Sequence, residues 1–235
     1  MTVEFLYPEL CNLYGDRGNM DYLRRCLPAE YRETAMGAEP WFVRHDVDLI
    51  YLCSMTERSQ QRVIDALRPH KARLAELMQQ GTHFLLTGNA MEVFGKTIQD
   101  GETAIEGLGL LDLTARRILP KRANSLFLGD FEGKKIVGYT SRFSHMESSL
   151  PPLFTAIKGL GRSEGAAAEG VRSGGVVRLA GVERVIAVRV QPVHAEHLRV
   201  VQPSDVGLHA YSFPARAGGL LLPFFVHYTR CARCV

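Results

Sequence analysis

The chain has 235 residues, of which 46% are hydrophobic and 23% are charged, and its formal net charge is +3. These values are typical of a globular protein with one larger α/β domain or two small domains. The longest apolar runs, such as Gly218 to Val226, are far shorter than the roughly 20 residues of a membrane span, and the start MTVEFLYPEL has no signal-peptide pattern. Five cysteines in this length do not form a disulfide framework. We therefore expect a cytoplasmic protein that does not insert into membranes.

Strand and helix patterns alternate along the first part of the chain. The apolar periodicity predicts strands at 3–7, 47–52 and 83–87, and helices at 20–27, 57–80 and 89–94. Asn19 is the expected cap of the first helix, Pro69 should divide the second helix, and Gly81 should end it. The run VDLIYL at 47–52 is almost entirely apolar, which indicates a strand buried on both faces. Repeated strand–helix–strand units favour a parallel, doubly wound α/β sheet.

The pattern changes in the second half of the chain. Residues 125–143 predict two strands joined by a turn at Glu132-Gly133. Residues 172–235 contain eight arginines, no lysine and three acidic residues, a net charge of +5, whereas residues 1–171 carry −2. The charge of the whole chain therefore describes neither part, and we expect no nucleic-acid binding from it. We divide the chain into a domain at 1–172 and a divergent tail at 173–235.

The segment HFLLTGNAMEVFGK at 83–96 places a small polar residue and a glycine where a strand turns into a helix. Nucleophile elbows have this pattern, because the turn exposes one side chain and directs the next backbone N–H groups at a developing oxyanion. Most glycine-containing turns of this kind only change the direction of the chain. Taken alone, the segment indicates a candidate site without defining its chemistry.

Several segments of residues 3–172 together resemble one protein family, and NLYGDRGN at 12–19 is the most specific of them. The others are VDLIYL at 47–52, ERSQQ at 57–61, LLTGNAMEVFGK at 85–96, IEGLGLLDL at 105–113, KKIVGYTSRFSH at 134–145 and GLGRSEGAAAEGVR at 159–172. In this order they resemble the class I (triad) glutamine amidotransferase-like proteins of the cobyric acid synthase type. Within that group the chain is most similar to the glutaminase subunit of lipid II isoglutaminyl synthase.

The resemblance implies a flavodoxin-like, doubly wound and mostly parallel sheet flanked by helices. It also implies glutamine hydrolysis at a Cys–His pair, with no cofactor and no metal. The ammonia would pass to a Mur ligase-like synthetase subunit that amidates lipid II in peptidoglycan synthesis, and the two subunits would form a heterodimer. A cobyric acid synthase-type amidotransferase domain of cobalamin biosynthesis is the alternative.

The resemblance assigns the nucleophile position, a cysteine in the family, to Thr87. Gly88 and Asn89 follow it and would bind the substrate through their backbone N–H groups. Cys53 and Ser54 fall at the glycine-rich oxyanion loop of the family, and they could still donate backbone N–H groups. A threonine hydroxyl needs a held general base, and a β-branched residue resists a strained elbow backbone. We therefore expect impaired glutaminase activity.

The family also has an arginine that binds the substrate and histidines near the site, and the sequence matches these positions only in part. Arg122, in PKRAN, falls at the position of the arginine that binds the glutamine carboxylate; a solvated basic run with Arg116, Arg117 and Lys121 is the alternative. The Asn-His pair of the family reads Ser141-Arg142 here, and His145 lies out of register. The segment that carries the catalytic histidine is not recognisable after residue 172.

The tail at 173–235 shows no resemblance to the family. We expect that it is translated in a shifted reading frame, because the resemblance stops where the composition changes; a genuine lineage-specific extension is the alternative. The tail contains His194-x-x-His197 and Cys231-x-x-Cys234, but the order and separation of these four residues fit no compact zinc module. Chance accounts for them better than a metal site does.

Three hypotheses fit these residues. The first is a glutaminase-type enzyme subunit that serves an ATP-dependent amidotransferase and takes glutamine as its ligand. The second is the same fold kept as a non-catalytic partner of the ligase subunit, with its chemistry lost at Thr87. The third is a damaged gene product without a stable function. Glutamine hydrolysis measured with and without a ligase partner separates the first two hypotheses.

Overall fold

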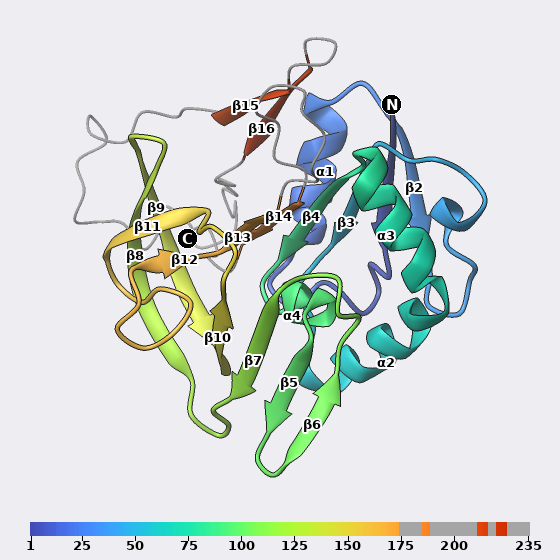
Figure 1. Cartoon of the computed structure of the whole chain (residues 1–235). Helices are drawn as coiled ribbons and strands as arrows, with labels where there is room; N and C mark the ends of the chain where they lie inside the picture. Colours follow the sequence, from blue (N-terminus) through green and yellow to red (C-terminus); the bar gives the residue numbers. More distant parts are fainter. Residues whose placement is uncertain (174–184, 189–210, 216–219, 225–235) are drawn as a thin grey trace, which may run out of the picture.

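A computed structural model describes residues 1–173, 185–188, 211–215 and 220–224, and its centre is a six-stranded sheet (Figure 1). The order across this central sheet is β13–β14–β4–β3–β1–β2. Its strands are β1 (Thr2–Leu6), β2 (Glu30–Thr34), β3 (Leu49–Leu52), β4 (His83–Thr87), β13 (Val171–Ser173) and β14 (Val185–Val188). All neighbouring pairs are parallel except β13 with β14. The mostly parallel α/β sheet predicted from the sequence is confirmed.

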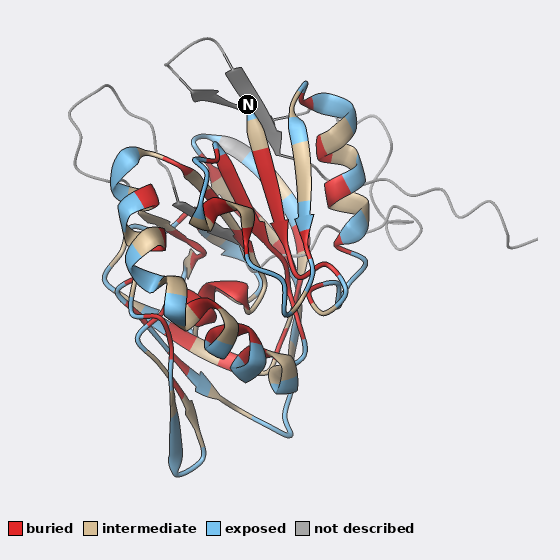
Figure 2. Ribbon diagram, turned by 90° about the vertical axis from the view of Figure 1, so that its right-hand side faces the viewer, coloured by how far each residue is buried: buried red, intermediate tan, exposed pale blue. Residues whose placement is uncertain are grey.

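Helices cover both faces of the central sheet (Figure 2). They are α1 (Arg17–Cys26), α2 (Glu57–Leu67), α3 (Lys71–Gln80) and the short α4 (Ala90–Phe94). Pro69 lies in the 3-10 turn that separates α2 from α3, and Gly81 ends α3 with a left-handed φ of 103°, as predicted. The predicted cap Asn19 is wrong, because α1 already begins at Arg17. The Arg17 N–H at this helix start donates to the Asn12 side chain at 2.9 Å.

The chain after α4 forms smaller sheets. The second sheet has the order β10–β7–β5–β6 and the third has the order β12–β11–β8–β9. Their strands are β5 (Thr97–Asp100), β6 (Thr103–Glu106), β7 (Leu113–Arg117), β8 (Ala123–Phe131), β9 (Lys134–Arg142), β10 (Ser144–Ser148), β11 (Phe154–Lys158) and β12 (Ala168–Glu169); β15 (Tyr211–Ala215) pairs with β16 (Leu220–Phe224). The predicted turn at Glu132 and Gly133 is confirmed: both have positive φ, as a two-residue hairpin loop of the mirror-image type requires.

The main core lies between the central sheet and its helices, where Figure 2 shows continuous burial. Every residue of β3 is buried, which confirms a strand covered on both faces. A second, smaller core of Phe127, Phe131, Leu153 and Phe154 lies on the third sheet and also contacts Leu85 of β4. Among the described residues no helix is long and apolar enough to cross a membrane.

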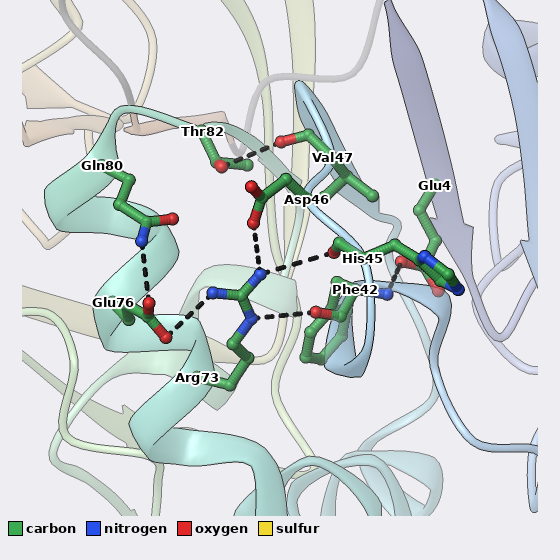
Figure 3. A network of polar contacts seen from close by, with 9 residues as sticks. All are labelled: Glu4, Phe42, His45, Asp46, Val47, Arg73, Glu76, Gln80 and Thr82. Carbon is green, nitrogen blue, oxygen red and sulfur yellow. Dashed lines mark hydrogen bonds and ion pairs between the residues drawn. The ribbon is translucent and has the colours of Figure 1, made fainter.

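A polar network fixes the chain on the amino side of β3 (Figure 3). Arg73 on α3 donates to the Phe42 carbonyl at 3.1 Å and to the Asp46 carboxylate at 2.5 Å. The fully buried carboxylate of Glu4 accepts hydrogen bonds from the backbone N–H groups of Trp41 at 2.7 Å and Phe42 at 2.9 Å. These bonds anchor the 3-10 turn Trp41–Val43 and leave the carboxyl ends of the parallel strands free for a site.

Most of the predicted tail at 173–235 lies outside the described residues, as do His194, His197, Cys231 and Cys234. The division into a domain and a tail, and the shifted reading frame, stay predictions.

Candidate functional site

Three segments meet at the carboxyl edge of the central sheet. Thr87 is the last residue of β4, Ser54 follows β3, and Asp16 follows β1 just before α1. β1, β3 and β4 are adjacent and parallel, so their carboxyl ends lie side by side. In open α/β sheets this edge is where ligands bind.

Asp16 is the buried acid of this site, with 2% of its surface exposed. Its carboxylate accepts a 2.7 Å hydrogen bond from the Ser54 hydroxyl and a longer one, at 3.4 Å, from the Thr87 hydroxyl. Burial raises the pKa of Asp16 above its ordinary value, and these hydrogen bonds offset part of that shift. Sequence analysis did not single out this residue. The available signal was its position as the only acid in NLYGDRGN, the most specific segment.

The turn after β4 takes its sharp bend at Gly88, which has a φ of +58°. A Cβ built on Gly88 would lie 2.6 Å from the Cβ of Ser54, so the turn has neither the conformation nor the space for a side chain there. Thr87 does not have a positive φ. The residue at the strained apex of this elbow-like turn is therefore a glycine.

Asn89 connects this turn to the loop after β3. Its side-chain oxygen accepts a hydrogen bond from the Met55 N–H at 3.0 Å, and its amide nitrogen donates to the Met55 carbonyl at 2.8 Å. The paired bonds hold the two loops at a fixed distance. Asn89 thus has a structural role in the elbow, in addition to the ligand contact predicted for its backbone.

A small pocket opens beside the turn, with a volume of about 30 Å³. It is lined by Leu13, Tyr14, Ser54, Glu57, Gly88, Asn89, Glu92, Ser141, Arg142, Phe143 and Ser144. The pocket contains two of the predicted backbone donors, Gly88 and Asn89, together with Ser54.

The floor of the pocket is a polar network around Glu92 of α4. Its carboxylate accepts hydrogen bonds from the Gln60 amide at 3.0 Å and the Ser144 hydroxyl at 2.5 Å. Gln60 in turn accepts a bond from Arg117 of β7 at 2.9 Å, and Arg117 also pairs with Asp100 at 2.6 Å. The network joins α2, α4 and the second sheet, so the pocket floor is rigid.

Arg122 contacts a lining residue of the pocket. Its guanidinium stacks 4.4 Å from the centre of the Phe143 ring, and Phe143 lines the pocket. The side chain is exposed, which leaves its donors available to a carboxylate. Arg122 thus contacts one residue that lines the pocket together with Gly88 and Asn89, and its role as the carboxylate ligand stays a prediction.

Cys53 and the histidines occupy other positions. The Cys53 thiol is fully buried, and burial raises its pKa well above the usual range, so it is protonated at neutral pH. His145 lies in β10, next to the pocket residue Ser144, and in the part of the chain that the structure describes no cysteine or histidine lines the pocket. The same part holds no group of three or more potential metal ligands.

No protein-family model matches the chain, and no curated protein matches it. Among solved structures the chain is similar to a glutamine amidotransferase from Thermotoga maritima, with a TM-score of 0.52 and 10% sequence identity. The alignment covers 81% of this chain and 75% of that chain. At this identity the likeness concerns the fold. The chain has a flavodoxin-like α/β fold similar to that of this glutamine amidotransferase, as predicted.

Proposed function

We propose that this chain is the glutamine amidotransferase-type subunit of an ATP-dependent, Mur ligase-like synthetase that amidates lipid II. In that complex it binds glutamine without hydrolysing it. The similarity of fold supports the amidotransferase class, and the order of the resembling segments along 3–172 supports the ligase-associated branch.

The conformation of Gly88 is the observation that carries the non-hydrolytic part of the proposal. Hydrolysis through a thioester needs a thiol at the exposed apex of the turn and a base within hydrogen-bond reach. Here the apex has a left-handed backbone, no side chain and a blocked Cβ position. Within the described residues the pocket wall also lacks a histidine.

The remaining groups of the pocket suit an amino acid. The carboxylates of Glu57 and Glu92 match an ammonium group, and the exposed guanidinium of Arg122, which stacks on the lining residue Phe143, matches a carboxylate. Ser141 and Ser144 also line the pocket, and their hydroxyl oxygens can accept hydrogen bonds from an amide. These features support glutamine as the ligand.

The test uses the full chain, L-glutamine and calorimetric titration, together with an enzymatic assay for released glutamate in the presence and absence of the synthetase. We expect heat of binding and no glutamate above the buffer control under either condition. D-glutamine serves as the ligand control, since it presents the same groups in the wrong arrangement. Glutamate release well above buffer, or L-glutamine binding no tighter than D-glutamine, would overturn the proposal.

A further inference from the structure

The outward face of the β8–β9 hairpin is apolar in its middle. Side chains alternate across a strand, so Leu126 and Leu128 of β8 point to the same side. Their partners in the register are Tyr139 and Val137 of β9, respectively. These four side chains form two directly opposed pairs on one surface. We call them the hairpin patch.

Two of the four residues of the hairpin patch are exposed, Leu126 at 63% and Val137 at 40%, while Leu128 and Tyr139 are half-buried. On the adjacent strand β11, Ile157 is 51% exposed. The opposite face of the same strands holds the small core that includes Phe127 and Phe131. An antiparallel sheet with one buried face normally places polar residues on the other face. Apolar residues on both faces indicate that the outer face contacts another surface.

The hairpin patch continues to the mouth of the pocket. The next pair on the same face of the hairpin is Asn124 with Ser141, and beyond it Arg122 stacks on Phe143. Ser141 and Phe143 line the pocket, and the Ser141 carbonyl accepts a 3.4 Å hydrogen bond from the Tyr14 hydroxyl. A partner protein that covers the hairpin patch would therefore lie beside the pocket opening.

The margin of the hairpin patch is basic. Lys121, Arg122 and Lys158 are exposed and form no ion pair with any other described residue. The two acids at the tip are neutralised, since Asp130 pairs with Lys135 at 2.9 Å and Glu132 pairs with Arg172 at 3.2 Å. The complementary surface thus has an apolar centre and an acidic margin.

We infer that the hairpin patch and its basic margin are the docking surface for the synthetase subunit, which presents an apolar surface bordered by acidic side chains. The inference rests on the proposed function, because it concerns the partner of the same pocket. Docking here places the partner beside the pocket mouth.

The experiment measures the affinity of the purified Mur ligase-like synthetase of the source organism for three forms of the full chain. They are the wild type, the double variant Leu126→Glu/Val137→Glu, and the control Ala104→Glu. Ala104 is an exposed strand residue on the second sheet, so its substitution adds the same kind of charge away from the hairpin patch. We expect the double variant to raise the Kd about tenfold or more, and the control to leave it unchanged.

Hydrogen exchange on the wild type gives a second readout that does not depend on any variant. Binding of the synthetase should slow amide exchange in 123–142 and leave 97–106 unchanged. The docking surface would be wrong if the synthetase binds the wild type and the double variant with the same affinity and does not slow amide exchange in 123–142. The proposed function would still stand in that case. A synthetase that does not bind the wild type overturns both. A wild type that is dimeric by light scattering, with a monomeric double variant, assigns the patch to self-association instead.

Discussion

The Ser54 hydroxyl donates a 2.7 Å hydrogen bond to the buried Asp16 carboxylate, while the Cβ of the same serine fills the space beside Gly88. One short side chain after β3 thus contacts the segment after β1 and the turn after β4. Because these segments come from three adjacent strands, Ser54 sets both the position of the acid and the shape of the turn. A change of side-chain volume at position 54 or 88 should therefore disturb the packing of the site.

Gly88→Ala should reduce the free energy of unfolding by about 2 to 5 kcal/mol. A left-handed backbone costs an L-residue about 1 to 2 kcal/mol, and the collision with Ser54 adds about 1 to 3 kcal/mol. Urea denaturation measures the change. Gly101→Ala is the matched control, because Gly101 has the same φ of +58° with nothing within 4 Å of its Cβ position. The free energy of unfolding of the control should fall only by the cost of the left-handed backbone, about 1 to 2 kcal/mol.

The collision can be separated from the backbone strain by a second substitution. In a Ser54→Gly background the Cβ that blocks position 88 is removed, so Gly88→Ala should then cost only about as much as Gly101→Ala. The double-mutant cycle therefore predicts a favourable coupling between 54 and 88. Additive effects in this cycle would show that Ser54 is not the obstacle.

Asp16→Asn should change how stability depends on pH. Burial raises the pKa of Asp16 above 3.8, so the folded protein holds this proton more tightly than the unfolded chain does. The stability of the wild type therefore falls as pH rises from 3.8 through the raised pKa. The asparagine variant lacks this loss, so its stability relative to the wild type should increase from acid to neutral pH.

Thermal unfolding of Asp16→Asn and the wild type over this pH range provides the measurement. Taking the difference between the two proteins cancels the contribution of Glu4, whose pKa burial also raises. A difference that does not vary with pH, or that changes in the opposite direction, would mean that the bonds from Ser54 and Thr87 outweigh burial.

Most of the central sheet could be predicted from the sequence, because its strands are apolar runs and its helices have an apolar stripe. β2 was missed: its sequence EYRET is largely polar, as an edge strand permits, and only Thr34 is buried. The strands β5, β6, β7 and β10 are four or five residues long and partly exposed, so they leave no continuous apolar signal. Asn19 was predicted as the cap because asparagine is a common residue at helix starts. The helix begins earlier, at Arg17, where the backbone N–H donates to the Asn12 side chain, and this contact could not be read from composition.

The site was predictable only where one segment contains it. Thr87, Gly88 and Asn89 are consecutive, so a strand-to-helix pattern sufficed to locate the turn. Asp16 and Ser54 are 38 residues apart, and their hydrogen bond exists only because β1 and β3 are neighbours in the sheet. The buried acid Glu92 was missed for the same reason, since its partner Ser144 lies 52 residues away.

Arg122→Ala should weaken L-glutamine binding about tenfold or more, because a charged hydrogen bond to the carboxylate contributes about 1.5 to 3 kcal/mol. Calorimetric titration measures the Kd. Lys121→Ala is the matched control, since it removes a neighbouring exposed cation that does not stack on Phe143. Equal losses in both variants would indicate a general effect of positive charge, and the assignment of Arg122 to the carboxylate would be wrong.

Thr87→Cys should not create glutaminase activity. The new thiol would replace a hydroxyl 3.4 Å from the Asp16 carboxylate, and a neighbouring negative charge disfavours the thiolate. The described pocket residues also include no histidine that could remove its proton.

Glutamate release by this variant should equal that of the parent and of the control Thr87→Ser, which keeps a hydroxyl at the same place. Site-resolved alkylation followed by mass spectrometry should give position 87 an apparent pKa above the value of about 8.5 for a free cysteine. Turnover clearly above the parent, or rapid alkylation at neutral pH, would mean that a base reaches Thr87 from elsewhere. The argument that the Gly88 apex and the missing base prevent hydrolysis would then be wrong, because the hydroxyl in place of a thiol would be the one barrier to activity in this chain.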